Sequence, residues 1–470
     1  MARKSCRILL VNPPYTKVTY EDVDRKAGAL QNPVLSLATV AAPLIEDGHD
    51  VRIADMDLEN EPYAFLEKTL KDFQPDYVGV TGTTPMALEM GKIAAKAKEL
   101  CPSAITVCGG VHVTTFPREM VTDAPFDVAV IGEGDFTLRD LIRSARPDSV
   151  PGIAFARGGE VVMTEPRPLV DDLDKLPLPA WQLYDIRRYK TSKLVERESP
   201  TGLLETSRGC VFQCTYCNKN IFGRKFRQKS PGRVADEIER MLRLGFREIH
   251  IEDDGFSTNL NKAKAICDEI IRRGLKFPWT LINGIRVNRT DEELVRKLKQ
   301  AGCYQAAFGI ESGNQQILDR IQKGITKDQV RKAIAITKKT GIETFGFFML
   351  GLPDETEQTM QDTIDFAVEL DLDIAKFAIT IPLPGTPLFD EYDEKGLILT
   401  KDWSRYLFHD LTLPVYKHPN LDWDTISQYY KKAYRQFYFR PKYALRRLWK
   451  GVTTGRIIYD VGYALKTKWW

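Results

Sequence analysis

Near the middle of the chain, residues 206–217 read TSRGCVFQCTYC. Cys210, Cys214 and Cys217 bring three thiols within eight residues, directly after a short β-rich run. Thiolates are soft ligands that suit iron–sulfur clusters and zinc, but a structural zinc site is usually closed by four ligands. The remaining cysteines are far away in sequence: Cys6, Cys101, Cys108, Cys267 and Cys303. The motif therefore favours a three-cysteine cluster with an open position that can bind a substrate or cofactor.

Strand-like and helical patterns alternate from this motif toward the C-terminus. Helical patterns separate the strands, for example at residues 234–244, 291–301, 327–340 and 356–370. This alternation predicts a parallel barrel or most of one. The six candidate strands are residues 203–206, 248–252, 279–283, 305–309, 344–350 and 375–381.

A second alternation precedes the motif, between residues 7 and 145. It predicts a parallel, doubly wound sheet. Its candidate strands are residues 7–11, 50–54, 77–81, 105–108 and 128–131. Small or glycine-rich turns follow four of these strands, at the edge where such sheets bind ligands. The turns are Asn12-Pro13-Pro14, Gly82-Thr83-Thr84, Gly109-Gly110-Val111-His112 and Gly132-Glu133-Gly134.

These patterns predict an α/β protein in four parts. A Rossmann-like domain spans residues 1–145, and a proline-rich connector with a hairpin around residues 158–159 spans 146–195. A partial six-stranded barrel spans residues 196–395, and a basic, aromatic-rich helical region spans 396–470.

Composition is that of a soluble globular protein, with 43% hydrophobic and 28% charged residues. The sequence contains no apolar run long enough to span a bilayer, and the first apolar run is too short for a secretory signal. We therefore expect the protein in the cytoplasm. The net charge is only +3, yet residues 431–470 contain 11 Lys or Arg, one acid and ten aromatic residues.

The cysteine spacing CxxxCxxC, with an aromatic residue before the last cysteine, resembles the radical S-adenosylmethionine (radical SAM) superfamily. Polar or glycine-rich motifs at the ends of the later strands strengthen the resemblance. They are Asp253-Asp254, Asn283 with Arg286, Gly309-Ile310-Glu311-Ser312-Gly313, Gly351-Leu352-Pro353 and Pro382-Leu383-Pro384-Gly385-Thr386-Pro387. With the preceding doubly wound domain, the succession resembles the subgroup that carries a cobalamin-binding domain, namely oxidative cyclases, hopanoid-modifying enzymes and class B methyltransferases.

The resemblance implies that Cys210, Cys214 and Cys217 hold a 4Fe–4S cluster whose open iron binds S-adenosylmethionine. Reductive cleavage of this cofactor would yield a 5′-deoxyadenosyl radical. Further implied cofactor contacts lie at the strand ends. They place Tyr216 near the adenine, Asp253 or Asp254 near the amino group, Asn283 nearby, Arg286 at the carboxylate, and Glu311 and Ser312 at the ribose.

The resemblance also implies that the N-terminal domain binds cobalamin. The motif Asp-x-His-x-x-Gly, which supplies a lower cobalt ligand in many such domains, is absent here. His112 lines the expected pocket, but we expect a lower cobalt face without histidine. A domain that has lost cobalamin is the alternative. The other residues expected at the cofactor are Gly82, Thr83, Gly109, Gly110, Gly132, Glu133 and Gly134.

The leading hypothesis is a cobalamin-dependent radical enzyme that methylates an unactivated carbon. Cyclisation or ring rearrangement of a lipid or porphyrin-like substrate, without methylation, is the first alternative. A tRNA methylthiotransferase is the second, and a cobalamin carrier or light sensor is the third. The context of Cys6, Cys101 and Cys108 argues against a second N-terminal cluster, and hence against the methylthiotransferase.

Expected partners are a small-molecule or lipid-like substrate and an electron donor such as flavodoxin or ferredoxin. Basic residues interleaved with Trp and Tyr are typical of bilayer interfaces, so we expect the C-terminal tail to contact the inner face of the membrane. Packing of the tail on the barrel is the simpler alternative. RNA could use the same pattern, but nucleic acid is not expected.

Overall fold

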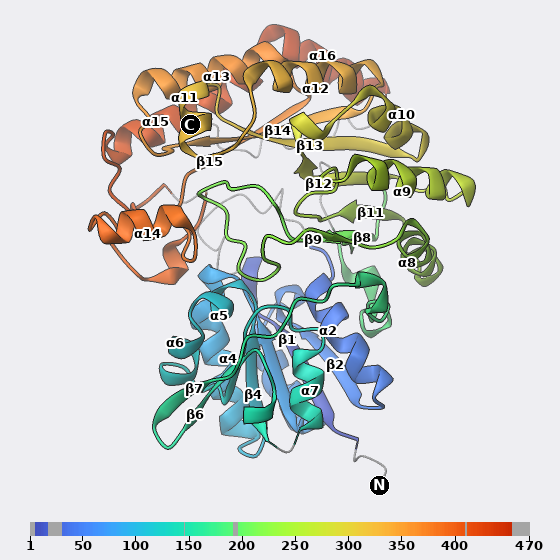
Figure 1. Ribbon diagram of the computed structural model, residues 1–470, viewed down its shortest axis with the longest axis vertical. Helices are drawn as coiled ribbons and strands as arrows, with labels where there is room; N and C mark the ends of the chain where they lie inside the picture. The colour runs from blue at the N-terminus through green and yellow to red at the C-terminus, as the bar shows by residue number, and fades with distance from the viewer. Residues whose placement is uncertain (1–4, 17–30, 145, 191–195, 409–410, 454–470) are drawn as a thin grey trace.

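A computed structural model describes residues 5–16, 31–144, 146–190, 196–408 and 411–453. Two sheet-containing units lie one above the other, with the N-terminal unit below and the second unit above in Figure 1. The C-terminal helices pack on the upper unit, and a segment around α14 (Pro387–Glu394) descends toward the lower one.

The N-terminal sheet has seven strands in the order β2-β1-β3-β4-β5-β6-β7. The first five are parallel, as the sequence predicts, and β6 and β7 form an antiparallel hairpin beside β5. This hairpin lies inside the expected connector, which therefore contributes to the sheet. The strands are β1 (Arg7–Asn12), β2 (Asp50–Asp55), β3 (Tyr77–Thr81), β4 (Ile105–Gly109), β5 (Val128–Val130), β6 (Ile153–Arg157) and β7 (Glu160–Met163).

Helices cover both faces of this sheet, which confirms the doubly wound arrangement. Alternate residues of β1 divide between two hydrophobic cores: Leu9 and Val11 belong to one, Ile8 and Leu10 to the other. Strands buried on both faces need a continuous apolar run, which β1 has. The helices are α2 (Leu35–Glu46), α3 (Pro62–Phe73), α4 (Ala87–Leu100), α5 (Val111–Thr115), α6 (Pro117–Thr122) and α7 (Thr137–Arg143).

The second unit is an open, six-stranded parallel sheet in the order β15-β14-β13-β12-β11-β8. Each neighbour in space is the next strand in sequence, as in a partial barrel. The expected strands are confirmed, with ends that shift by a few residues. They are β8 (Thr201–Leu204), β11 (Glu248–Ile251), β12 (Trp279–Ile285), β13 (Cys303–Glu311), β14 (Glu343–Leu350) and β15 (Ile374–Ile379).

Side-chain caps start the helices that follow these strands. In each case the capping oxygen accepts a hydrogen bond from a backbone N–H of the first turn, which would otherwise be unpaired. The helices and their caps are α8 (Pro231–Leu244) with Ser230, α9 (Leu260–Arg272) with Asn259, α10 (Glu292–Gln300) with Asp291, α11 (Gln315–Arg320) with Asn314, α12 (Lys327–Lys339) with Thr326, α13 (Glu357–Leu370) with Thr356, and α14 with Thr386.

The C-terminal region contains α15 (Trp423–Tyr438) and α16 (Pro441–Thr453). Phe437 of α15 is fully buried in the barrel core, and the hydroxyls of Tyr434 and Tyr438 bond to the backbone of β15. Packing on the barrel is therefore confirmed for part of the aromatic tail. Tyr459, Tyr463, Trp469 and Trp470 lie outside the described residues. No helix in the described ranges has the length and apolarity needed to cross a membrane.

Candidate functional site

The cysteine loop leaves β8 through the short strand β9 (Ser207–Arg208), which pairs with β10 (Arg227–Gln228). Cys210 is half-buried, Cys214 is buried and Cys217 is exposed. Backbone bonds shape the loop, from Cys217 N–H to the Cys214 carbonyl (3.4 Å) and from Cys210 N–H to the Gly223 carbonyl (3.3 Å). The sequence therefore folds into a hydrogen-bonded loop that contains all three thiols, from the buried Cys214 to the exposed Cys217.

All eight cysteines lie within the described residues and are free thiols. The pKa of Cys217 is raised to about 11, first by desolvation and then by the charges of Cys214 and Cys210 when these ionise. No three His, Cys, Asp or Glu side chains of the described residues converge to hold one metal ion. A 4Fe–4S cube does not require such convergence, because each thiolate binds a different iron. The donor set therefore fits a cluster with one open iron.

Asp253, at the end of β11, holds the start of the cysteine loop. Its carboxylate accepts hydrogen bonds from Thr206 N–H (2.6 Å), Ser207 N–H (3.1 Å) and Ser207 Oγ (2.7 Å), and from the Thr206 hydroxyl. Burial raises its pKa to about 6, against the opposing effect of these bonds. Both oxygens are engaged within the protein, so Asp253 positions the loop instead of facing a ligand.

Asp254 differs from its neighbour because its side chain is exposed. Surrounding protein raises its pKa, while a hydrogen bond from the Gly209 backbone and the charge of Lys219 lower it. Asp254 therefore lies beside the residue that precedes Cys210. Asn283, near the end of β12, is also exposed. These two side chains are free to meet a ligand at this edge.

Arg286 lies over Phe212 of the cysteine loop, with the guanidinium carbon 3.5 Å from the ring centroid. Its hydrogen bonds go to neutral groups, namely the carbonyls of Lys323 and Gly324 and the side chain of Asn288 (3.3 Å). No acidic residue pairs with it within the described part of the chain. A positive charge without a counter-ion in the described residues therefore lies against Phe212 of the cysteine loop.

Glu311, at the end of β13, forms an ion pair with Lys323 (2.7 Å), whose ammonium also contacts the Tyr216 hydroxyl (3.1 Å). Glu311 has φ +67°, an uncommon conformation for a residue with a side chain. Ser312 points elsewhere, to Thr363 Oγ1 (3.0 Å) and the Asn314 N–H. The structure thus joins Glu311 with Tyr216, while Ser312 supports the following turn.

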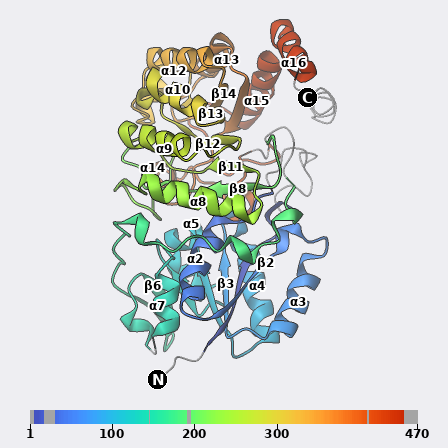
Figure 2. The same cartoon turned by 90° about the vertical axis from the view of Figure 1, so that its right-hand side faces the viewer.

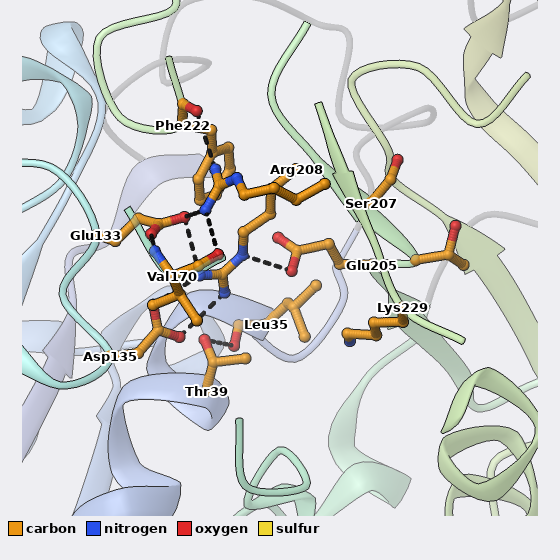
Figure 3. A network of polar contacts seen from close by, with 12 residues as sticks. Leu35, Thr39, Glu133, Asp135, Val170, Glu205, Ser207, Arg208, Phe222 and Lys229 are labelled. Atoms are coloured by element: carbon orange, nitrogen blue, oxygen red, sulfur yellow. Dashed lines mark hydrogen bonds and ion pairs between the residues drawn. The ribbon is translucent and has the colours of Figure 1, made fainter. Parts of the chain in front are cut away.

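A buried ionic network connects the cysteine loop to the N-terminal sheet (Figure 3). Arg208 donates to both oxygens of Asp135 (2.8 and 3.0 Å), to Glu205 (2.7 Å) and to Glu133 (3.3 Å). Arg227 donates to Glu133 (2.7 Å) and to the Val170 carbonyl (2.9 Å). Although burial opposes it, the Arg208 charge keeps the pKa of Asp135 below its ordinary value. Glu133, expected at a cofactor, is instead committed to two arginines.

The glycine-rich turns of the N-terminal sheet fall into two kinds. A Cβ on Gly110, which has φ +110°, would lie 2.7 Å from the Gly82 carbonyl oxygen, so these two turns need glycine to approach each other. At Gly109 and Gly132 an added Cβ would make only ordinary van der Waals contact, 3.8 Å from its nearest atom. The turns at Gly109 and Gly132 are therefore less crowded than those at Gly82 and Gly110. Thr83 and Gly134 follow the same strand ends.

His112 begins α5 and is only 2% exposed. Its ring contacts Phe116 (5.3 Å between centroids) and Trp403 (5.6 Å), and Trp403 comes from the C-terminal region. Burial lowers the pKa of His112 to about 4, so the ring is neutral at pH 7. Its Nδ1 is buried without a hydrogen-bond partner among the described residues.

Sequence reasoning missed the side chains that join distant segments, namely Arg208, Arg227, Lys323 and Trp403. Arg208 stands inside the quoted motif, so its position was visible, but its partners Glu133 and Asp135 precede it by more than 70 residues. Lys323 and Trp403 had no local signal, because neither stands in a motif.

Two family profiles match the chain. The radical SAM superfamily profile matches residues 204–367, and the B12 binding domain profile matches residues 28–142. The first segment covers β11 to β14 of the partial barrel with the cysteine loop, and the second covers β2 to β5 of the doubly wound sheet.

Relatives resemble the chain over most of its length. An uncharacterized methyltransferase of Pyrococcus horikoshii is 35% identical, covering 95% of both chains. The anaerobic magnesium-protoporphyrin IX monomethyl ester cyclase of Cereibacter sphaeroides is 30% identical, covering 85% of this chain and 68% of the relative. The solved structure of OxsB, a cobalamin-dependent S-adenosylmethionine radical enzyme, has a TM-score of 0.74 at 19% identity, covering 97% of this chain and 72% of the other.

The fold and the three-thiol loop thus define a radical SAM enzyme with an N-terminal B12-binding domain. The chain belongs to the radical SAM superfamily, within the group of cobalamin-dependent methyltransferases and cyclases. Its cofactors are a 4Fe–4S cluster, S-adenosylmethionine and cobalamin.

We predict that Arg208→Met destabilises the protein and lowers its iron content. Removing the guanidinium leaves Asp135 and Glu205 buried without their counter-ion, which costs roughly 3–5 kcal/mol. The free energy of unfolding in urea and the iron bound after anaerobic reconstitution measure the effect. The control is Lys225→Met, because Lys225 forms an exposed ion pair with Asp171 and exposed pairs contribute less than about 1 kcal/mol. Wild-type stability and full iron in Arg208→Met would contradict this role.

Proposed function

We propose that S-adenosylmethionine binds across the carboxyl edge of the barrel, beside the cysteine loop. The uncompensated charge of Arg286 next to Phe212 is the observation that carries this proposal, because it fits a carboxylate beside the open iron. Asp254 is exposed beside Gly209, the residue before Cys210, and suits the amino group. Glu311, held by Lys323, is placed for the ribose hydroxyls, and Tyr216 for the adenine. Asp253 and Ser312 support the site from behind.

We propose that cobalamin binds at the carboxyl edge of the N-terminal sheet, near Gly109 and Gly132. This unit extends through the hairpin to residue 163, past the boundary expected at residue 145. Bound together, the cofactors supply a carbon-centred radical and a transferable methyl group. The role of the protein is to hold the two sites face to face, which Arg208 and Arg227 do through the buried network.

The reaction that we propose is methylation of an unactivated carbon. Support comes from the P. horikoshii relative, whose name is that of a methyltransferase and which matches nearly the whole chain. Cyclisation without methylation is the second candidate, since the C. sphaeroides relative is named as a cyclase. A methyltransferase releases S-adenosylhomocysteine together with 5′-deoxyadenosine, whereas a cyclase releases only the latter. Product analysis therefore separates the two.

A methylthiotransferase would need a second cluster in the N-terminal unit. Cys101 directly follows α4 and Cys108 lies within β4, and both are buried in one hydrophobic core of the N-terminal unit. Burial raises the pKa of both thiols, which disfavours metal binding. The structure therefore supports one cluster per chain.

Cleavage of S-adenosylmethionine needs one electron from outside, and we propose flavodoxin or ferredoxin as the donor. Val211 and Cys217 are exposed on the cysteine loop, which leaves a path for such a partner. Eight free thiols are typical of a reducing compartment, so we propose that the enzyme works in the cytoplasm.

We predict that Cys214→Ala abolishes formation of 5′-deoxyadenosine, because loss of one thiolate leaves the cluster labile. The anaerobically purified wild type should hold about four irons and one cobalamin per chain. Cys267→Ala is the matched control, since Cys267 is buried in α9 away from the loop. Undiminished 5′-deoxyadenosine from Cys214→Ala would refute the cluster assignment, and about eight irons without cobalt would favour the methylthiotransferase.

We predict that cobalamin is bound without a histidine ligand. His112 is held between Phe116 and Trp403, and the sequence lacks Asp-x-His-x-x-Gly. Paramagnetic resonance of the cobalt(II) protein should show no splitting from an axial nitrogen, in the wild type and in His112→Ala alike. Nitrogen splitting that disappears in His112→Ala would contradict this prediction.

We also propose that α16 rests on an anionic membrane surface. Its exposed apolar residues recur at helical spacing: Leu445 (68% exposed), Leu448 (51%), Trp449 (72%) and Val452 (57%). Lys442 is 86% exposed beside this stripe, and Figure 2 shows α16 projecting from the side of the barrel. An apolar stripe flanked by basic residues is typical of helices that lie in the bilayer interface.

We predict that the protein cosediments with phosphatidylglycerol-containing vesicles at low salt and is released at high salt. The double variant Leu445→Glu/Trp449→Glu should lose this binding. A truncation after Tyr430 is unsuitable, because it would remove Phe437 from the barrel core. Leu399→Glu/Leu413→Glu is the control, as both residues are more than half exposed elsewhere. Equal sedimentation with neutral and anionic vesicles, or none with either, would contradict binding to an anionic membrane. Packing on the barrel would then be the only role of the C-terminal region.

A further inference from the structure

The two faces of the barrel sheet differ along β15. Ala375, Phe377 and Ile379 are buried in the core shared with the surrounding helices. Because side chains alternate along a strand, Lys376 projects from the opposite face, which the barrel helices do not cover. Lys376 is exposed on that face, whereas its two neighbours are buried.

Lys376 lies in the same row as residues of the S-adenosylmethionine site. Its register partner on β14 is Phe347, and the register partner of Phe347 on β13 is Gly309. An added Cβ on Gly309 would lie 2.7 Å from Glu311 Oε1 and 2.9 Å from Lys323 Nζ. With strands about 4.8 Å apart, Lys376 is about 10 Å from Gly309. Two residues after Phe347 on β14, Met349 belongs to a small hydrophobic cluster against which Tyr216 of the cysteine loop packs.

The ammonium of Lys376 has no counter-ion in the part of the chain that the structure describes. On the same face, Glu311 and Lys323 form an ion pair with each other at 2.7 Å, so Glu311 already has a cationic partner. The surrounding protein desolvates Lys376 enough to lower its pKa, with no acidic group offsetting the effect. A solvated surface lysine would not be desolvated in this way, so the charge stands in an enclosed but accessible position.

Protection of a sheet edge is the simplest alternative role for this lysine, because β15 is the edge strand. That edge is already closed by α15. The Tyr434 hydroxyl bonds to N–H and C=O of Phe377, and the Tyr438 hydroxyl to N–H and C=O of Ala375. The edge therefore needs no further protection, and Lys376 points away from it.

We propose that Lys376 binds an anionic group of the substrate, a carboxylate or a phosphate-type oxyanion. The rings of Phe345 and Phe347 lie on the same face, 4.7 Å apart, and are only partly buried. They provide an apolar wall beside the ammonium. The substrate class is thus an apolar or aromatic skeleton with an acidic substituent. This inference rests on the proposed radical SAM function, in which Arg286 takes the carboxylate of S-adenosylmethionine.

Small probes test this assignment without knowledge of the substrate. The reconstituted holoenzyme is titrated with phenylphosphonate, phenylacetate and neutral phenylacetamide, and binding is followed by calorimetry. The wild type should bind at least one anion about tenfold more tightly than the amide, as expected for a charge-assisted hydrogen bond. The preferred anion tells a phosphate-type substituent from a carboxylate.

Lys376→Met should lose this preference, while Lys376→Arg should keep it. Lys276→Met is the control, since Lys276 is exposed before β12, at the opposite end of the barrel. Equal binding of the anions by wild type and Lys376→Met would overturn the proposal. Binding of S-adenosylmethionine, read from the cluster spectrum of the same samples, should be unchanged in Lys376→Met. Its loss would also overturn the proposal, because Lys376 would then belong to the cofactor site.

The experiment distinguishes a wrong enzyme function from a wrong role for Lys376. If the wild type neither binds nor cleaves S-adenosylmethionine, the proposed function is wrong whatever the probes do. If cleavage is normal and the probes bind equally to both proteins, only the role of Lys376 is wrong.

Discussion

The buried arginine–carboxylate network is the interaction on which the rest of the molecule depends. Arg208 belongs to the strand that starts the cysteine loop, and Asp135 and Glu133 belong to the turn after β5. Charges buried this deeply are tolerated only when every one is paired, so the network fixes one arrangement of the two sheets. The carboxyl edges of both sheets meet there, and each edge is where its fold binds ligands.

The C-terminal segment closes the junction from a third side. Trp403 stacks on Phe116, which lies between α5 and α6 (5.1 Å between centroids), while Tyr392 and Tyr406 share a core with Tyr216 of the cysteine loop. Gly385 shows how close this approach is, because a Cβ there would lie 2.9 Å from Thr115 Oγ1 of the N-terminal unit. One short segment thus contacts both cofactor-bearing edges.

The charged residues at the junction between the two sheets fall into two groups, those with a counter-ion and those without one. Around Arg208 every carboxylate accepts a hydrogen bond from an arginine, which suits a structural support. Arg286 and Lys376, at two places on the barrel, keep their charge without an acidic partner in the described residues, which suits ligands that carry anions. Asp254 is exposed and accepts a hydrogen bond from the Gly209 backbone, so an acidic and a basic side chain both contact the cysteine loop.

The sequence by itself determined the alternation of strands and helices, both sheets and the three cysteines, because hydrophobic period and ligand spacing are local properties of the chain. It also marked Arg286 and Glu311, which stand at strand ends. Only the tertiary structure decided that Asp253 and Glu133 support the protein while Asp254 stays exposed, since a carboxylate can face a backbone N–H, an arginine or solvent. Lys376 shows the same limit. The role of a lysine in a strand can be inferred only when the face of the sheet, the strand register and the charged neighbours are known.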